Sequence, residues 1–166
     1  MSEIAILVVE DEPEVRDAVV RDLAPFAHHF RIEAAEDVAD ARAVLQELAE
    51  QRVPVGLILC DHLLPGTLGT DFLVELHAGE ATRATRKVLL TGQAGLDDTV
   101  RAINEAGLDY YIAKPWTPDG LQEAVRHELT EFVLGGDFDV LGYVVVLDGP
   151  RLVAAAADRD WEGRRI

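Results

Sequence analysis

Two kinds of hydrophobic pattern alternate along the chain, and this alternation limits the possible folds more than any other feature of the sequence. Short, continuous apolar runs are typical of strands that are buried on both faces. Between these runs, apolar residues recur every three or four positions, as they do on one face of a helix. The pattern predicts five such strands, at residues 4–9, 30–35, 55–60, 87–90 and 109–113.

A predicted helix follows each predicted strand. The clearest helix starts are Pro13, which suits a first helical turn, Asp37, which is a predicted N-cap, and the pair Thr117-Pro118. Strands that alternate with helices form right-handed βαβ units, and these place a parallel sheet between two layers of helices. We therefore expect residues 1–134 to form one α/β domain.

The pattern changes in residues 135–166, which we treat as a C-terminal extension. Apolar stretches at 139–147 and 151–157 flank a turn signal at residues 148–149, so the pattern predicts a β-hairpin. Pro150 leaves the geometry of this turn open.

An isolated hairpin is barely stable in water, so the extension must pack on the domain or on another chain. Strand addition between two copies would make a homodimer, and we expect the extension to be a dimerisation element of this kind. The polar tail from Asp158 to Ile166 is expected to be frayed.

Composition and charge argue against several classes of protein. The chain carries 31 acidic and 15 basic side chains, a net charge of −16, whereas contacts to phosphates require clustered cations, so no direct nucleic-acid partner is expected. Cys60 is the only cysteine, which excludes an intrachain disulfide and a multi-cysteine metal site. No apolar run approaches the ~20 residues of a membrane span, and the N-terminus lacks the basic start of a signal peptide. We therefore expect a cytoplasmic protein with no membrane partner.

Polar residues follow the predicted strands at the ends where ligands bind in sheets of this kind. Glu10 and Asp11 follow the first strand, Asp61 the third, Thr91 the fourth and Lys114 the fifth. Carboxylates that gather at one edge repel each other unless a cation lies between them, and an all-oxygen site favours Mg²⁺ or Mn²⁺. The sequence therefore predicts a divalent-metal site at this edge.

A hydroxyl and an ammonium beside a metal-bound carboxylate suit the transfer of a phosphoryl group to that carboxylate. The metal and Lys114 would neutralise the phosphoryl oxygens, and Thr91 would donate a hydrogen bond to them. Asp61 would be the nucleophile and would form an aspartyl phosphate. Glu12 and Glu14, in contrast, are expected only to favour the start of the following helix through its dipole.

These residues belong to four motifs that together resemble the receiver domain of two-component response regulators. The motifs are Leu-Val-Val-Glu-Asp-Glu-Pro at 7–13, Asp-His-Leu-Leu-Pro at 61–65 with Gly69, Leu-Thr-Gly at 90–92, and Tyr-Ile-Ala-Lys-Pro-Trp at 111–116. The Lys-Pro-Trp ending is similar to that of receivers fused to signalling or redox enzymes.

The resemblance implies both a fold and a function. The fold is a flavodoxin-like, doubly wound sheet of five parallel strands in the order 2-1-3-4-5. The function is a Mg²⁺-dependent phosphorylation switch with no effector enzyme in this chain. A sensor histidine kinase or a phosphotransfer protein would be one partner, and a downstream protein would be the other.

The resemblance also implies the roles of individual residues at the metal site. Asp61 matches the phosphoacceptor, while Glu10, Asp11 and the backbone carbonyl of Leu63 match the ligands that hold Mg²⁺ beside it. Glu10 stands where many relatives have aspartate, a variant that need not abolish Mg²⁺ binding. His62, next to the phosphoacceptor, is expected to contact a partner.

Further positions match the switch of the family. Thr91 and Tyr111 match the hydroxyl and the aromatic ring that move together, and Lys114 matches the lysine that pairs with the phosphoryl group. Supporting positions of the motifs are Pro65, Gly69, Gly92 and Pro115, the last of which matches the cis-proline of the family.

Two other functions remain open. An aspartate-nucleophile phosphohydrolase would usually place a second aspartate two residues after the nucleophile, where this chain has Leu63. A degenerate receiver that only scaffolds would lack one of the residues that carry the chemistry, yet all are present. In receivers, the positions of Leu63 and Gln93 modulate the lifetime of the phosphoryl group, and an apolar Leu63 predicts a lifetime of minutes or more.

Overall fold

A five-stranded parallel sheet forms the centre of the molecule in the computed structural model, which describes residues 3–92 and 95–164. The strand order is β2-β1-β3-β4-β5, and every neighbouring pair is parallel. This order confirms the doubly wound, flavodoxin-like sheet. Gln93, whose position the resemblance links to the lifetime of the phosphoryl group, lies outside the described residues. The strands are β1 (Ile4–Val9), β2 (Phe30–Ala35), β3 (Val55–Cys60), β4 (Arg86–Leu90) and β5 (Tyr110–Ile112).

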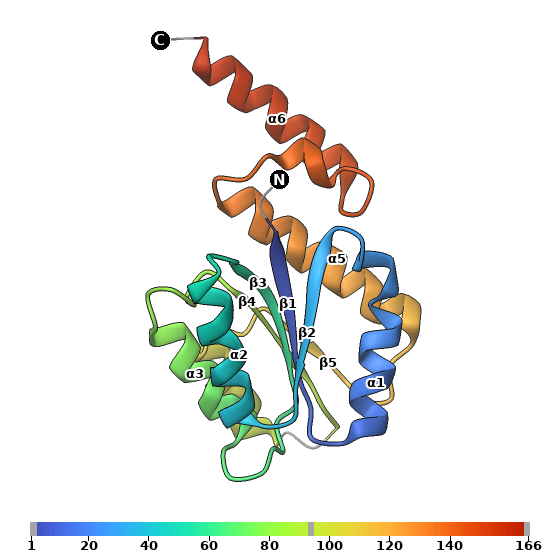
Figure 1. Ribbon diagram of the computed structural model, residues 1–166, viewed down its shortest axis with the longest axis vertical. Helices are drawn as coiled ribbons and strands as arrows, with labels where there is room; N and C mark the ends of the chain where they lie inside the picture. The colour runs from blue at the N-terminus through green and yellow to red at the C-terminus, as the bar shows by residue number, and fades with distance from the viewer. Residues whose placement is uncertain (1–2, 93–94, 165–166) are drawn as a thin grey trace.

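Helices cover both faces of the sheet, as Figure 1 shows. Apolar residues of α1 and α5 belong to the hydrophobic core on one face, and those of α2 and α3 belong to the core on the other. No helix within the described residues is long and apolar enough to cross a membrane. The helices of this layered body are α1 (Pro13–Asp22), α2 (Val38–Glu50), α3 (Gly69–Ala78), α4 (Leu96–Glu105) and α5 (Pro118–Gly135).

The local signals at the helix starts act as the sequence predicts. The carboxylate of Asp37 accepts a hydrogen bond from the backbone N of Asp40 at 2.7 Å, and the hydroxyl of Thr117 accepts one from the backbone N of Gly120 at 3.1 Å. Both side chains satisfy amide groups that the first helical turn leaves without an intrahelical partner.

The C-terminus of α2 closes in a motif that usually contains glycine. The backbone N of Arg52 donates to the carbonyl of Ala49 at 3.0 Å, and the backbone N of Val53 donates to that of Leu48 at 2.8 Å. This pair of bonds defines a Schellman motif, whose first residue after the helix cap adopts a left-handed conformation. Arg52 occupies that position with a φ of 59°.

The predicted β-hairpin of the extension is wrong. A short 3-10 helix, η2 (Val140–Tyr143), and a long helix, α6 (Gly149–Gly163), occupy the segment instead. Because α6 continues to Gly163, the expected frayed tail from Asp158 is also wrong, and the described part of the extension holds no strand that a second copy could pair with.

Residues at the start of α6 explain this outcome. The carboxylate of Asp148 accepts a hydrogen bond from the backbone N of Arg151 at 3.3 Å, so a residue of the predicted turn is in fact an N-cap. Pro150 lies in the first helical turn, where its missing N–H costs nothing. The alanines at 154–157 are strong helix formers, and a short apolar run alone does not distinguish a strand from a buried helix segment.

Of the two alternatives left open, the extension packs on the domain. The ring of Tyr143 is buried and stacks on that of Phe30, with 5.5 Å between the ring centroids. Figure 1 shows η2 and α6 beyond the end of the sheet at which the strands begin. The extension residues that share a hydrophobic core with α1 and α5 are Val140, Tyr143, Val146, Leu147 and Leu152.

Candidate functional site

Three carboxylates meet at the carboxyl ends of β1 and β3. These strands are neighbours, with Val9 opposite Cys60, so the residues that follow them emerge side by side. Glu10, Asp11 and Asp61 each offer an oxygen atom, and these three atoms lie within 4.8 Å of one another. An all-oxygen set of this kind fits a hard divalent cation such as Mg²⁺.

Lys114 reaches this cluster from the loop after β5. Its Nζ donates to Glu10 Oε2 at 2.7 Å and to Asp61 Oδ2 at 3.1 Å. Burial alone would lower the pKa of Lys114, but its hydrogen bond to Glu10 and the charge of Asp61 outweigh this effect and raise the pKa. The ammonium is therefore held in its charged form. The peptide bond between Lys114 and Pro115 is cis, as the resemblance implies.

Glu10 is the buried member of the pair that follows β1. Burial raises the pKa of Glu10, and the hydrogen bond from Lys114 offsets only part of that rise. Asp61 is also buried, and its Oδ1 accepts a hydrogen bond from the backbone N of His62 at 2.7 Å. The two buried carboxylates thus share one lysine, while the Oδ1 atom of Asp61 is held by a backbone amide.

A hollow of about 670 Å³ opens above the carboxylates. The phenol of Tyr111 donates a hydrogen bond to the backbone carbonyl of Thr91 at 2.8 Å, which links β5 to one wall of the hollow. Pro65 and Tyr111 are not among the lining residues. Those that line it are Asp11, Glu12, Val15, Asp61, Leu63, Thr91, Gly92, Lys114, Pro115 and Trp116.

Gly69 supports the site through the backbone. A Cβ atom at this position would lie 1.8 Å from the backbone oxygen of Asp61, and the backbone N of Gly69 donates to the carbonyl of His62 at 2.7 Å. The first turn of α3 can therefore lie against the backbone of Asp61 only because residue 69 has no side chain.

Two contacts of the site were missed or misassigned from the sequence. His62 is buried rather than presented to a partner: its Nε2 lies 3.1 Å from Asp98 Oδ2 on α4. The indole N of Trp116 donates to Asp22 Oδ2 at 2.8 Å, which holds the ring at the rim of the hollow. Each contact joins residues far apart in the chain, so no local pattern indicates it.

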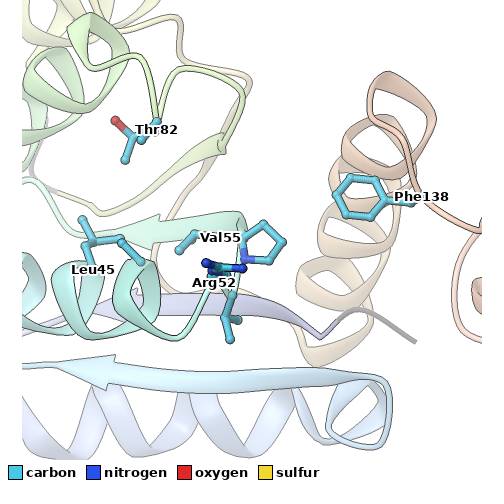
Figure 2. Close-up of a pocket in the computed structure, with 9 residues that line it drawn as sticks. Leu45, Arg52, Val55, Thr82 and Phe138 are labelled. Atoms are coloured by element: carbon cyan, nitrogen blue, oxygen red, sulfur yellow. The ribbon is translucent and has the colours of Figure 1, made fainter.

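A second hollow, of about 470 Å³, lies at the opposite end of the sheet (Figure 2). Leu45 of α2, Val55 and Thr82 lie on one side of it. The ring of Phe138, from the segment after α5, points into it from the other side. We call this hollow the Phe138 groove. It contains none of the residues that the sequence singles out.

Comparison with known proteins agrees with this geometry. The family described as the response regulator receiver domain matches residues 6–126. The hydrogenase transcriptional regulatory protein HoxA of Cupriavidus necator is 36% identical over 132 residues, which cover 80% of this chain and 25% of HoxA. The phosphate regulon transcriptional regulatory protein PhoB of Escherichia coli is 36% identical over 121 residues, 73% of this chain and 49% of PhoB. The chain thus spans half or less of the length of these relatives.

Solved structures give the same fold. The CheY-like response regulator receiver domain protein from Methanospirillum hungatei JF-1 superposes with a TM-score of 0.69 at 29% identity. The alignment covers 81% of this chain and all of the other.

Proposed function

The chain belongs to the family of response regulator receiver domains, and from this premise we propose that it is a switch in which Asp61 accepts a phosphoryl group. A carboxylate oxygen of Asp61 attacks the phosphorus of the donor, and the bond from phosphorus to the donor atom breaks as the donor leaves. A sensor histidine kinase or a phosphotransfer protein supplies the phosphoryl group. Residues 1–134 form the receiver, and residues 135–166 form its extension.

The contact that carries this proposal is that of Lys114 with both Glu10 and Asp61, at 2.7 and 3.1 Å. Phosphoryl transfer needs positive charge next to the oxygens that gain negative charge. Lys114 already lies against Oδ2 of the carboxylate that would be modified, and its raised pKa keeps it charged. It would pair with the phosphoryl oxygens once they arrive.

The carboxylate cluster would hold Mg²⁺. Glu10, Asp11 and Asp61 supply the side-chain oxygens, and we assign the backbone carbonyl of Leu63 as a further ligand on the basis of the family motif. The cation supplies charge neutralisation for the incoming phosphoryl group. The three oxygen atoms within 4.8 Å of one another support this assignment.

Thr91 and Tyr111 would carry the signal away from Asp61. Thr91 lines the same hollow as Asp61, and the phenol of Tyr111 donates a hydrogen bond to the backbone carbonyl of Thr91. We propose that the Thr91 hydroxyl turns toward the phosphoryl group and that the Tyr111 ring moves with it. Gly92, next in the chain, would leave room for this motion.

Helix α4 offers the surface for a downstream protein. Its inward side carries Ala102, whereas apolar side chains project from its outward side. Exposed apolar residues are typical of interaction sites when they form a contiguous group rather than lie singly. Those on this surface are Leu96, Val100 and Ile103 of α4, with Tyr110 of β5 beside them.

The proposal is tested by measuring the intact mass of the protein after incubation with Mg²⁺ and acetyl phosphate. We expect the mass of one phosphoryl group to be added to the wild type and not to Asp61→Asn. A chelator added before the phosphodonor should also prevent the addition. Folded protein that gains no mass from either acetyl phosphate or a phosphorylated kinase would overturn the proposal in favour of a scaffold.

A phosphate-release assay with a phosphomonoester separates the switch from a phosphohydrolase. Leu63, with 47% of its surface exposed, stands where such an enzyme would need a carboxylic acid to protonate the leaving group. We therefore expect no turnover of a phosphomonoester and a phosphoryl group that persists for minutes. Release of phosphate over many turnovers would favour the hydrolase.

A further inference from the structure

Helix α6 presents an apolar stripe on its outer side. Leu152 is buried and Ala156 packs against the domain, so this side of the helix faces the core. Val153, Ala157 and Trp161 follow one another at intervals of four residues and therefore share another face. Val153 is 55% and Trp161 61% exposed. This face, which we call the α6 stripe, points away from the core.

The last turns of α6 bury almost nothing within one molecule. All side chains from residue 157 to 163 are exposed. Arg159 ties this half to the body: its guanidinium donates to the backbone carbonyls of Leu134, Gly136 and Phe138 at 2.9 to 3.3 Å. Because helices this short are marginal in water without tertiary packing, an apolar stripe here indicates a surface that packs on something else.

The Phe138 groove is an apolar surface of the kind on which the α6 stripe can pack. Its walls are mainly apolar, with Leu45, Ala49, Val55 and Phe138 among them (Figure 2). Among the described residues that line it, Arg52 is the only ionisable one, and this arginine lies at the turn after α2.

The arginine that lines the groove has acidic counterparts beside the α6 stripe. The acidic residues Asp158, Asp160 and Glu162 lie beside the α6 stripe and are exposed. Arg159, in the same segment, is turned toward backbone carbonyls of its own chain. An apolar stripe edged by carboxylates thus matches an apolar groove that contains a guanidinium.

The α6 stripe cannot reach the groove of its own chain while α6 stays where it is. Arg151 pairs with Glu131 of α5 at 2.6 Å, and the backbone N of Asp148 donates to the hydroxyl of Thr130 at 3.2 Å. These contacts hold the N-terminal end of α6 on α5, and the hydrogen bonds of Arg159 hold its C-terminal half. Occupancy of the groove by α6 therefore requires a second chain.

We propose that two copies of this chain associate by placing the α6 stripe of each in the Phe138 groove of the other. Both surfaces lie at the end of the molecule where the strands begin, so a two-fold axis can bring each stripe to the opposite groove (Figure 1). The dimer then contains the same contact, stripe in groove, twice. The arrangement replaces the strand pairing that the sequence predicted and needs no phosphorylation.

Sedimentation velocity on the full chain tests the proposal. We expect the wild type to sediment as a dimer of the 18.2 kDa chain at concentrations of about 100 μM. Ala157→Glu in the stripe and Ala49→Glu in the groove should each weaken association at least tenfold, because both place a carboxylate in the apolar contact. Both alanines are exposed, so neither change should prevent folding. Ala43→Glu, on α2 but not among the residues that line the groove, is the matched control and should remain dimeric.

A mixture of the two variants gives the decisive result. Ala157→Glu keeps an intact groove, and Ala49→Glu keeps an intact stripe, so a heterodimer retains one of the two contacts. We expect the mixture to associate more tightly than either variant alone. A monomeric wild type, an Ala49→Glu variant that dimerises normally, or a mixture without this gain would each overturn the proposal; the second result would indicate that two α6 helices pair directly.

Discussion

Replacing Arg52 by glycine should stabilise the fold while weakening the proposed association. Arg52 holds a φ of 59° at the end of α2, where its Cβ atom crowds the following carbonyl. Left-handed backbone costs an L-residue roughly 1–2 kcal/mol, and the greater freedom of glycine in the unfolded chain returns about 0.5–1 kcal/mol of this. The expected net gain in the free energy of unfolding is therefore about 0.5–1 kcal/mol.

This gain translates into a measurable change in melting temperature. With about 2.1 cal/mol/K of unfolding entropy per residue, a chain of 166 residues has an unfolding entropy of roughly 350 cal/mol/K. The melting temperature should therefore rise by about 1.5–3 °C. The assay is calorimetry of dilute protein, so that association does not contribute to stability.

Arg52→Ala is the matched control, because it removes the guanidinium but keeps the Cβ atom. It should show no gain in melting temperature, yet it should lose the same association as Arg52→Gly. If Arg52→Gly melts no higher than the wild type, or if Arg52→Ala gains as much, the backbone argument is refuted. Normal association of both variants would instead remove Arg52 from the proposed interface.

Three further changes test other parts of the structure by urea unfolding. Gly69→Ala should lower the free energy of unfolding by more than about 3 kcal/mol, because its Cβ atom would lie 1.8 Å from the backbone oxygen of Asp61. A smaller loss would mean that α3 can shift away from Asp61 at little cost. Tyr143→Ala should cost about 3–5 kcal/mol if the extension is part of the core, whereas Val145→Ala, at an exposed position, should cost under about 0.5 kcal/mol. Burial lowers the pKa of Lys87 to about 8, so the folded chain loses this proton before the unfolded one as the pH rises. The free energy of unfolding of the wild type, minus that of Lys87→Met, should therefore increase by about 1–2 kcal/mol from pH 7 to pH 9.5. A difference that does not change with pH would contradict the lowered pKa.

The body of the fold could be predicted because its signals are local and agree with one another. β1 and β3 are continuous apolar runs, and in the structure both are buried almost throughout. Once the strands are parallel, the residues after them must meet at one edge, so the carboxylates and Lys114 could be brought together without any knowledge of contacts.

The parts that could not be predicted depend on contacts between distant segments. The apolar stretch at 151–157 fits a strand or a helix by its pattern alone, and the cap at Asp148 together with packing on α5 favours the helix. The Phe138 groove joins residues of α2, the loop before β4 and the segment after α5, none of which carries a motif. The burial of His62 is likewise decided by its contacts with Thr70 and Asp98.

The chain contains two tryptophans, and the fold places them in different surroundings. Trp116 lies at the hollow above the carboxylates with its indole held by Asp22, and Trp161 projects from the exposed end of α6. Fluorescence can therefore follow the two ends of the molecule separately without an added dye. With Trp161→Phe, emission reports only what enters the hollow; with Trp116→Phe, it reports only what covers α6.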